Sequence, residues 1–157
     1  RDNAPHYQHS EIGYNYRLSN ISAGIGRGQM MVLSSHIKLR QQMHDFYVDY
    51  FKNIKGVKVF NEPNSNFSSN HWLSCILIDQ SIVGKNRDDL RLSLEKENIE
   101  SRPLWKPMHL QPVFEKYPYY GGKVCEELFE NGLCLPSGSN LSEYDKNRIL
   151  EVFNRFF

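Results

Sequence analysis

A single helical stripe of apolar residues runs through the first third of the chain and constrains its fold more than any other feature. Ser19 or Asn20 can cap this helix by accepting a hydrogen bond from one of its first amide groups, and Gly56 is placed to end it. The spacing predicts one helix of roughly nine turns, with the rest of the domain packed along its apolar face. The stripe consists of Ile21, Ile25, Val32, Leu39, Met43, Phe46, Tyr50 and Ile54.

Shorter elements follow the long helix, and their order predicts an α/β domain in which helices pack against a small mixed sheet. The run at 71–79 is rich in strand formers and is expected to be central, whereas Pro103 cannot donate to a ladder and puts its strand at an edge. Ser142 and Asp145 form a capping-box pattern at the start of the last helix. That helix is expected to bury Ile149, Val152, Phe153 and Phe156. The sequence indicates strands at 57–60, 71–79, 100–105 and 133–138, helices at 86–99, 124–132 and 141–157, and an irregular loop at 106–122.

The composition is that of a globular domain and excludes two classes of partner. Hydrophobic residues make up 39% and aromatic residues 13% of the chain, whereas disordered chains have few aromatics. The formal net charge is +1 and the sequence has no basic stripe, so a nucleic acid is not expected as the main partner. No apolar run reaches the roughly 20 residues of a membrane helix, and the start resembles no signal peptide. The chain begins without methionine, and this predicts a piece of a longer protein.

The cysteines indicate a reducing compartment. Cys75, Cys125 and Cys134 form no CxxC pair. Because Cys75 and Cys134 lie in apolar runs, buried and reduced thiols are expected. Reduced thiols are typical of the cytoplasm, which is therefore the expected location.

Three familiar site patterns do not fit the sequence. The glycines of GIGRG, Gly24 to Gly28, lack the preceding strand that a dinucleotide fingerprint requires, and close packing of another backbone explains them better. None of the six histidines belongs to an HExxH-like pattern, so no metal site is expected. His36 and His44 are expected on the surface of the long helix. The sequence also contains no GxSxG nucleophile motif.

The stretch IGYNYRLSN, just before the long helix, is too polar for a core strand and too aromatic for an idle loop. If it is extended, Asn15 and Arg17 project from one side, and Tyr14 and Tyr16 project from the other. An amide and a guanidinium so placed can bind phosphate oxygens. The alternative is that the two tyrosines attach the arm to the helix while the arginine is solvated.

A second polar and aromatic stretch, SRPLWKPMHLQP, occupies 101–112. Arg102, Trp105, Lys106 and His109 lie close together in a loop braced by prolines. Rigid loops that present such side chains often bind ligands, because ordering them on binding costs little free energy. The alternative is a structural loop with a packed tryptophan.

Together these stretches resemble a known family. EIGYNYRLSNISAGIGRGQM, then ESRPLWKPMHLQPVF, then LCLPSGSNLSEYDKNRI are similar to the C-terminal part of the DegT/DnrJ/EryC1/StrS sugar aminotransferases. These are fold-type I, pyridoxal-phosphate enzymes that act on nucleotide-linked keto-sugars. The resemblance extends from about Tyr7 to Phe157. The second stretch is most similar to members that aminate C4 of UDP-2-acetamido-4-keto-2,6-dideoxy-hexoses, and the family's usual amino donor is glutamate.

The resemblance implies a fold and a set of ligand contacts. Residues 1–19 would be an active-site arm, and residues 20–157 would be the small C-terminal α/β domain. In a homodimer, Asn15 would reach the cofactor phosphate bound by the other subunit, and Arg17 would contact the nucleotide-sugar, commonly its diphosphate. The proline-braced loop would bring three side chains near the sugar or nucleotide, namely Arg102, Trp105 and His109.

The same resemblance implies that catalytic parts are missing. In this family the Schiff-base lysine lies upstream of the segment that this chain matches, so no catalytic residue is expected here. Lys106 would then be a surface or anion contact, and the chain alone should be inactive without the large domain and a second subunit. Two alternatives remain: a non-catalytic binding or regulatory module that reuses the domain, and an unrelated α/β domain.

Overall fold

A computed structural model describes residues 2–14 and 18–157, and its longest element is the expected helix. Helix α1 spans Asn20–Phe51, and the Ser19 hydroxyl caps it by accepting a hydrogen bond from the Ser22 amide at 3.2 Å. Gly56 follows with φ +83°, a left-handed conformation that favours glycine. The helix therefore starts where the sequence indicates and ends a few residues earlier than its apolar stripe.

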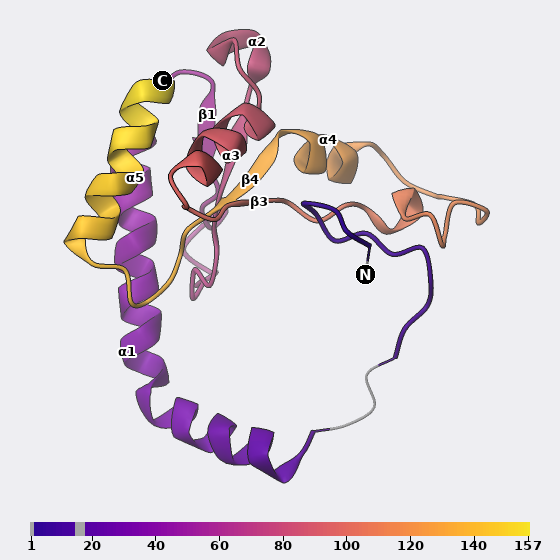
Figure 1. Cartoon of the computed structure of the whole chain (residues 1–157), viewed down its shortest axis with the longest axis horizontal. Helices are drawn as coiled ribbons and strands as arrows, with labels where there is room; N and C mark the ends of the chain where they lie inside the picture. Colours follow the sequence, from indigo (N-terminus) through magenta and orange to yellow (C-terminus); the bar gives the residue numbers. More distant parts are fainter. Residues whose placement is uncertain (1, 15–17) are drawn as a thin grey trace.

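Only the second half of α1 is buried, and this corrects the stripe predicted from its periodicity. Met43, Tyr47 and Phe51 are at most 2% exposed. In contrast, Ile21 is 78% exposed and Ile25 is 61% exposed, and the first half of α1 extends away from the rest of the domain (Figure 1). Periodicity identifies an apolar face but not what covers it. This chain covers that face only where the sheet and the last helix reach it.

In the part of the chain that the structure describes, four strands form one sheet in the order β1-β2-β4-β3. All three strand pairings are antiparallel, so the expected mixed sheet is wrong in this respect. Side-chain alternation is the same in both kinds of strand, and strand direction therefore could not be read from the sequence. The central place of β2 and the edge place of β3 are confirmed. The strands are β1 Val57–Val59, β2 Ser74–Ile78, β3 Arg102–Pro103 and β4 Gly132–Leu135.

Helices pack on the face of the sheet that carries Ile76 and Leu133, which are paired across β2 and β4 and fully buried. Figure 1 shows α5 beside the second half of α1, and the Phe153 ring of α5 lies 5.1 Å from the Phe51 ring of α1. Ile149, Val152, Phe153 and Phe156 are buried as the sequence predicts. The remaining helices are α2 Gln80–Val83, α3 Arg87–Lys96, a 3₁₀ turn at Met108–Leu110, α4 Val124–Asn131 and α5 Glu143–Phe156.

The opposite face of the sheet carries the cysteine pair. Cys75 and Cys134 lie directly across β2 and β4, with their sulfur atoms 3.6 Å apart, and all three cysteines are free thiols. Cys134 is buried, Cys75 is partly buried and Cys125 is exposed. Burial of the two strand cysteines is therefore complete for one and partial for the other.

The capping box at the start of α5 is confirmed, and it makes a stability prediction. The Asp145 amide donates to the Ser142 hydroxyl, and the Ser142 amide donates to the Asp145 carboxylate at 2.9 Å. Ser142→Ala should lower the free energy of unfolding by about 1 kcal/mol, measured by urea titration against Ser65→Ala, an exposed loop control.

The pH dependence of that difference follows from Asp145. Hydrogen bonds from the Ser142 side chain and amide hold the pKa of Asp145 below its ordinary value of 3.8. A lowered pKa stabilises the fold above the ordinary value, and this contribution is lost as the pH falls through the folded-state pKa. The difference in free energy of unfolding between wild type and Ser142→Ala should therefore become smaller in acid. A difference that stays constant down to pH values below the carboxylate range would contradict this role for Asp145.

Among residues 2–14 and 18–157, no helix combines the length and the apolar character needed to cross a bilayer.

Candidate functional site

An aromatic cavity of about 300 Å³ opens beside β3. The Trp105 ring has two aromatic neighbours: Tyr7 is stacked on it with ring centroids 6.4 Å apart and an interplanar angle of 8°, and the Trp72 ring centroid lies 5.9 Å away. Trp105 is 48% exposed and Trp72 58% exposed, so both can meet a ligand. The lining residues are Tyr7, Trp72, Leu73, Glu100, Ser101, Arg102, Pro103, Trp105, Cys134, Leu135, Pro136 and Ser137.

Hydrogen bonds from α1 fix the inner wall of this cavity. The Arg40 guanidinium donates to the carbonyl oxygens of Trp72 at 2.6 Å and Ser137 at 2.9 Å. The Tyr47 hydroxyl donates to the Pro136 carbonyl at 2.7 Å, and burial raises the pKa of Tyr47, so this group stays a donor. The second half of α1 thus holds the segments before β2 and after β4 in a fixed relation.

Arg102 puts a cation at the rim of the cavity. Its Nε donates to the Glu100 carboxylate at 2.7 Å and its Nη1 to the Tyr7 hydroxyl at 3.4 Å. The hydrogen bond and charge of Glu100 raise the pKa of Arg102 above its ordinary value. Because the side chain is nearly half exposed, the guanidinium keeps donor groups for an incoming anion.

Arg102 and Trp105 therefore share one cavity, but His109 lies elsewhere. The His109 ring stacks on Tyr119 at 3.6 Å, and its Nε2 lies 3.0 Å from the Glu126 carboxylate. His109 lines a second cavity of about 330 Å³ together with Met108, Phe114, Tyr117, Pro118 and Tyr119. The structure thus brings together two of the three loop residues that the sequence singles out.

A histidine pair, His44 of α1 and His71, corrects a prediction. His44 is 3% exposed, whereas the sequence suggested a surface position. Its ring stacks on His71 at 3.7 Å, and its Nε2 lies 2.8 Å from the Asn61 side-chain oxygen. His71 Nε2 lies 3.1 Å from the Glu62 carboxylate, and burial together with His44 lowers the pKa of His71. The described part of the chain contains no metal-binding cluster.

The cofactor arm predicted from the sequence is only partly described. Asn15 and Arg17 lie outside the described residues. The residues on either side, Tyr14 and Leu18, are 75% and 73% exposed. Among residues 2–14 and 18–157, nothing lies within 4 Å of a Cβ built on Gly24, Gly26 or Gly28, so these residues do not supply the close packing expected there.

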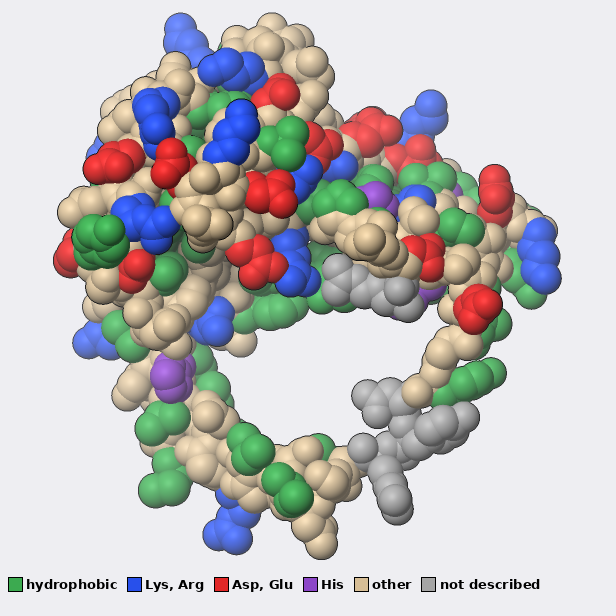
Figure 2. All heavy atoms as spheres, viewed as in Figure 1, with side chains coloured by type: hydrophobic (Ala, Val, Ile, Leu, Met, Phe, Trp, Pro, Cys, Tyr) green, Lys and Arg blue, Asp and Glu red, His purple; other side chains and the backbone are tan. Residues whose placement is uncertain are grey.

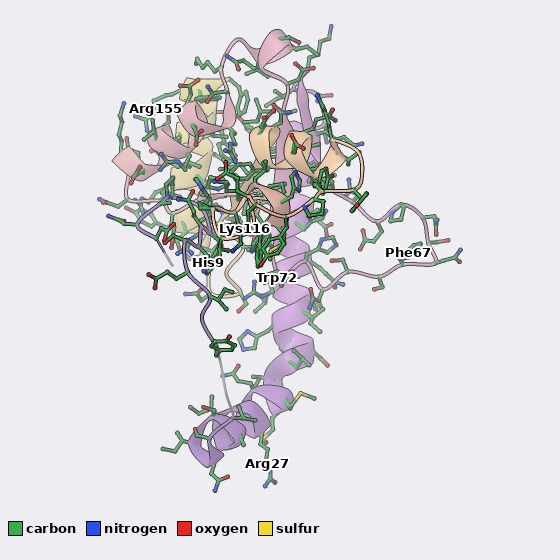
Figure 3. The ribbon with its side chains drawn as sticks, turned by 90° about the vertical axis from the view of Figure 1, so that its right-hand side faces the viewer. His9, Arg27, Phe67, Trp72, Lys116 and Arg155 are labelled. Carbon is green, nitrogen blue, oxygen red and sulfur yellow. The ribbon has the colours of Figure 1, made fainter. Side chains whose placement is uncertain are left out.

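The first half of α1 carries an exposed apolar surface. Figure 2 shows hydrophobic side chains along it, and Figure 3 places Arg27 at the end of α1 that is far from Trp72. The exposed apolar residues are Ile21, Ile25, Met30, Met31, Val32 and Leu33.

The sequence reasoning missed three residues of this region. Tyr7 and Trp72 complete the aromatic cavity, and Gln111 connects the arm to the loop. The strand predicted at 71–79 included Trp72, whereas the observed strand begins at Ser74. Its signal was an aromatic residue next to a polar, turn-rich stretch. For Tyr7 and Gln111 no local signal existed, because their contacts join distant parts of the chain.

Comparison with known proteins identifies relatives of this chain. The profile of the DegT/DnrJ/EryC1/StrS aminotransferase family matches residues 1–154. EpsN of Bacillus subtilis (strain 168), described as a putative pyridoxal phosphate-dependent aminotransferase, is 44% identical over 161 residues, covering 100% of this chain and 40% of that protein. GDP-perosamine synthase of Escherichia coli O157:H7 is 32% identical over 152 residues, covering 96% of this chain and 40% of that protein.

The fold agrees with this match. The crystal structure of a DegT DnrJ EryC1 StrS aminotransferase from Brucella abortus superimposes with a TM-score of 0.75 at 30% identity, covering 96% of this chain and 39% of that one. The predicted α/β domain with a long first helix is thereby confirmed. The chain spans about 40% of the length of the curated relatives it matches. By its profile match and its relatives, the chain belongs to the DegT/DnrJ/EryC1/StrS aminotransferase family.

Proposed function

We propose that this chain is the C-terminal part of a pyridoxal-phosphate-dependent aminotransferase. The whole enzyme would transfer an amino group from glutamate to a UDP-linked 4-keto-6-deoxy sugar, for polysaccharide or glycan synthesis. The observation that carries the proposal is the match along nearly all of this chain to about 40% of each relative. The three free cysteines support a cytoplasmic enzyme.

The exposed apolar half of α1 supports the presence of further protein. The side chains of Ile21, Ile25 and Met31 are 61% to 89% exposed. Exposed apolar surface of this kind is typical of an interface. The enzyme's own large domain and a second subunit are the proposed partners of this surface. The glycines of the first turns then leave room for their backbone.

The arm fits the cofactor by its chemistry and its surroundings. Pyridoxal phosphate, when bound, supplies the carbonyl group that accepts the amino group, and it requires a lysine that we place outside this chain. The exposed flanks Tyr14 and Leu18 point to a segment that contacts groups outside the domain. The Asn15 amide would hold the cofactor phosphate of the other subunit, and the Arg17 guanidinium would hold the substrate diphosphate.

The aromatic cavity would bind the nucleotide-sugar beside this arm. Trp105 and Trp72 offer faces on which a planar base can stack, and Arg102 offers a cation for a phosphate. His109, bound to Glu126, would orient the loop from the second cavity. These roles match a substrate in which a planar base lies next to an anionic phosphate.

A chimera tests the proposal. This chain would replace the matching C-terminal segment of the B. subtilis relative, which is 44% identical. The chimera should bind pyridoxal phosphate with its visible absorbance band and aminate UDP-2-acetamido-4-keto-2,6-dideoxy-glucose with glutamate. The 157-residue chain alone should do neither, because we place the Schiff-base lysine outside it.

Borohydride reduction followed by peptide mass mapping locates the lysine. The pyridoxyl label should lie in the part contributed by the relative. A stoichiometric label on one lysine of this chain, such as Lys106, would contradict the proposal. A chimera that binds the nucleotide-sugar but never the cofactor would instead favour the non-catalytic binding module.

A further inference from the structure

The side chain of Gln111 is buried in an otherwise irregular loop and is 4% exposed. It forms hydrogen bonds with three backbone groups, two in the arm and one five residues earlier in the same loop. Its Oε1 accepts from the His9 amide at 2.9 Å, and its Nε2 donates to the Tyr7 carbonyl at 2.8 Å and the Lys106 carbonyl at 3.2 Å. One amide thus connects the arm to the substrate loop.

This pattern requires a carboxamide. The His9 amide needs an acceptor, and the carbonyl groups of Tyr7 and Lys106 need donors, so the network fixes which end of the side chain is oxygen. A carboxylate would put an anion against two carbonyl oxygens. An apolar side chain would take the hydrogen-bond partner from three partly buried backbone groups.

The amide sets the position of an aromatic wall of the cavity. The Tyr7 carbonyl is bound by Gln111, and the Tyr7 ring stacks on Trp105. Two further hydrogen bonds join the arm to the loop. The Lys106 amine donates to the Gln8 side chain at 2.9 Å, and the Val113 amide donates to the His9 carbonyl at 3.4 Å. Figure 1 shows the arm running beside the segment that follows β3, and Figure 3 places His9 on the same side of the molecule as Trp72.

We propose that Gln111 is a positioning residue for substrate binding, which holds Tyr7 against Trp105 so that the cavity is preformed for the nucleotide part of the sugar nucleotide. This inference rests on the proposed function. Preformed walls raise affinity because less order must be imposed on binding.

Hydrogen exchange of the 157-residue chain tests the anchor without any activity. In Gln111→Leu and Gln111→Glu, the His9 amide should exchange at least about tenfold faster than in wild type, since its buried acceptor is lost or its segment released. Exchange in β2 should not change, which shows that the domain is folded. Gln42→Glu, an exposed position on α1, is the matched control. Unchanged exchange at His9 in both variants would overturn the anchor.

Calorimetric titration of the chimera with UDP-N-acetylglucosamine tests the role in binding. Gln111→Leu should raise the Kd about tenfold, and Tyr7→Ala should raise it similarly. If Gln111 acts through Tyr7, the double variant should bind no more weakly than Tyr7→Ala alone. A merely structural effect would add to that of Tyr7→Ala, and this additive result would overturn the inference. Failure of the unsubstituted chimera to bind would count against the proposed function instead, since the exchange experiment does not depend on it.

Discussion

Replacing Phe153 with alanine should lower the free energy of unfolding by about 3–5 kcal/mol, the largest effect expected of any single substitution in this chain. Phe153 is fully buried at the centre of an aromatic cluster. Its ring lies 5.2 Å from Tyr50, 5.1 Å from Phe51 and 6.2 Å from Tyr47. Truncation removes the contacts that join α5 to α1 and leaves a cavity that these large rings cannot fill.

Urea unfolding followed by circular dichroism measures this loss. Phe67→Ala is the control, because that ring is 59% exposed in the loop between β1 and β2 and its removal should change the midpoint little. Phe153→Leu should be intermediate, since it keeps part of the buried volume. Equal midpoints for Phe153→Ala and Phe67→Ala would show that α5 is not packed on α1 as described.

Replacing Asn15 with alanine should weaken cofactor binding in the chimera by about 1–3 kcal/mol, the loss expected for a hydrogen bond to a charged group. The expected result follows from the proposed role of Asn15 at the cofactor phosphate. Spectrophotometric titration with pyridoxal phosphate measures it, and expressed as affinity the change is about 5- to 150-fold.

Asn3→Ala is the matched control, because Asn3 is an exposed asparagine of the same arm. It should leave the cofactor affinity unchanged. Unchanged affinity in Asn15→Ala as well would remove the proposed contact, while leaving the family assignment intact.

Some elements were predictable because their cause is local. Ser19 and Ser142 cap their helices through groups three residues away, and such patterns survive in any tertiary context. Pro103 puts β3 at an edge of the sheet because it cannot donate to a second neighbour.

The candidate site was predictable only in part. Arg102 and Trp105 could be singled out because their loop concentrates ligand-binding side chains within a few positions. Tyr7 contributes to the same cavity from nearly 100 positions away, and its bond to Arg102 spans 95 positions. His44 was misplaced because its burial depends on Asn61 and His71, which the helix periodicity does not contain.

The sequence by itself determined the long helix, the central strand, the caps and the family, because each depends on residues close together or on a motif order that survives without coordinates. Only the tertiary structure decided which half of α1 is buried, that the strands run antiparallel, and that Tyr7, Trp72 and Gln111 meet the substrate loop. The physical reason is that burial and pairing depend on which distant surfaces come into contact. An apolar stripe or an isolated glutamine is compatible with many such arrangements until the chain has folded.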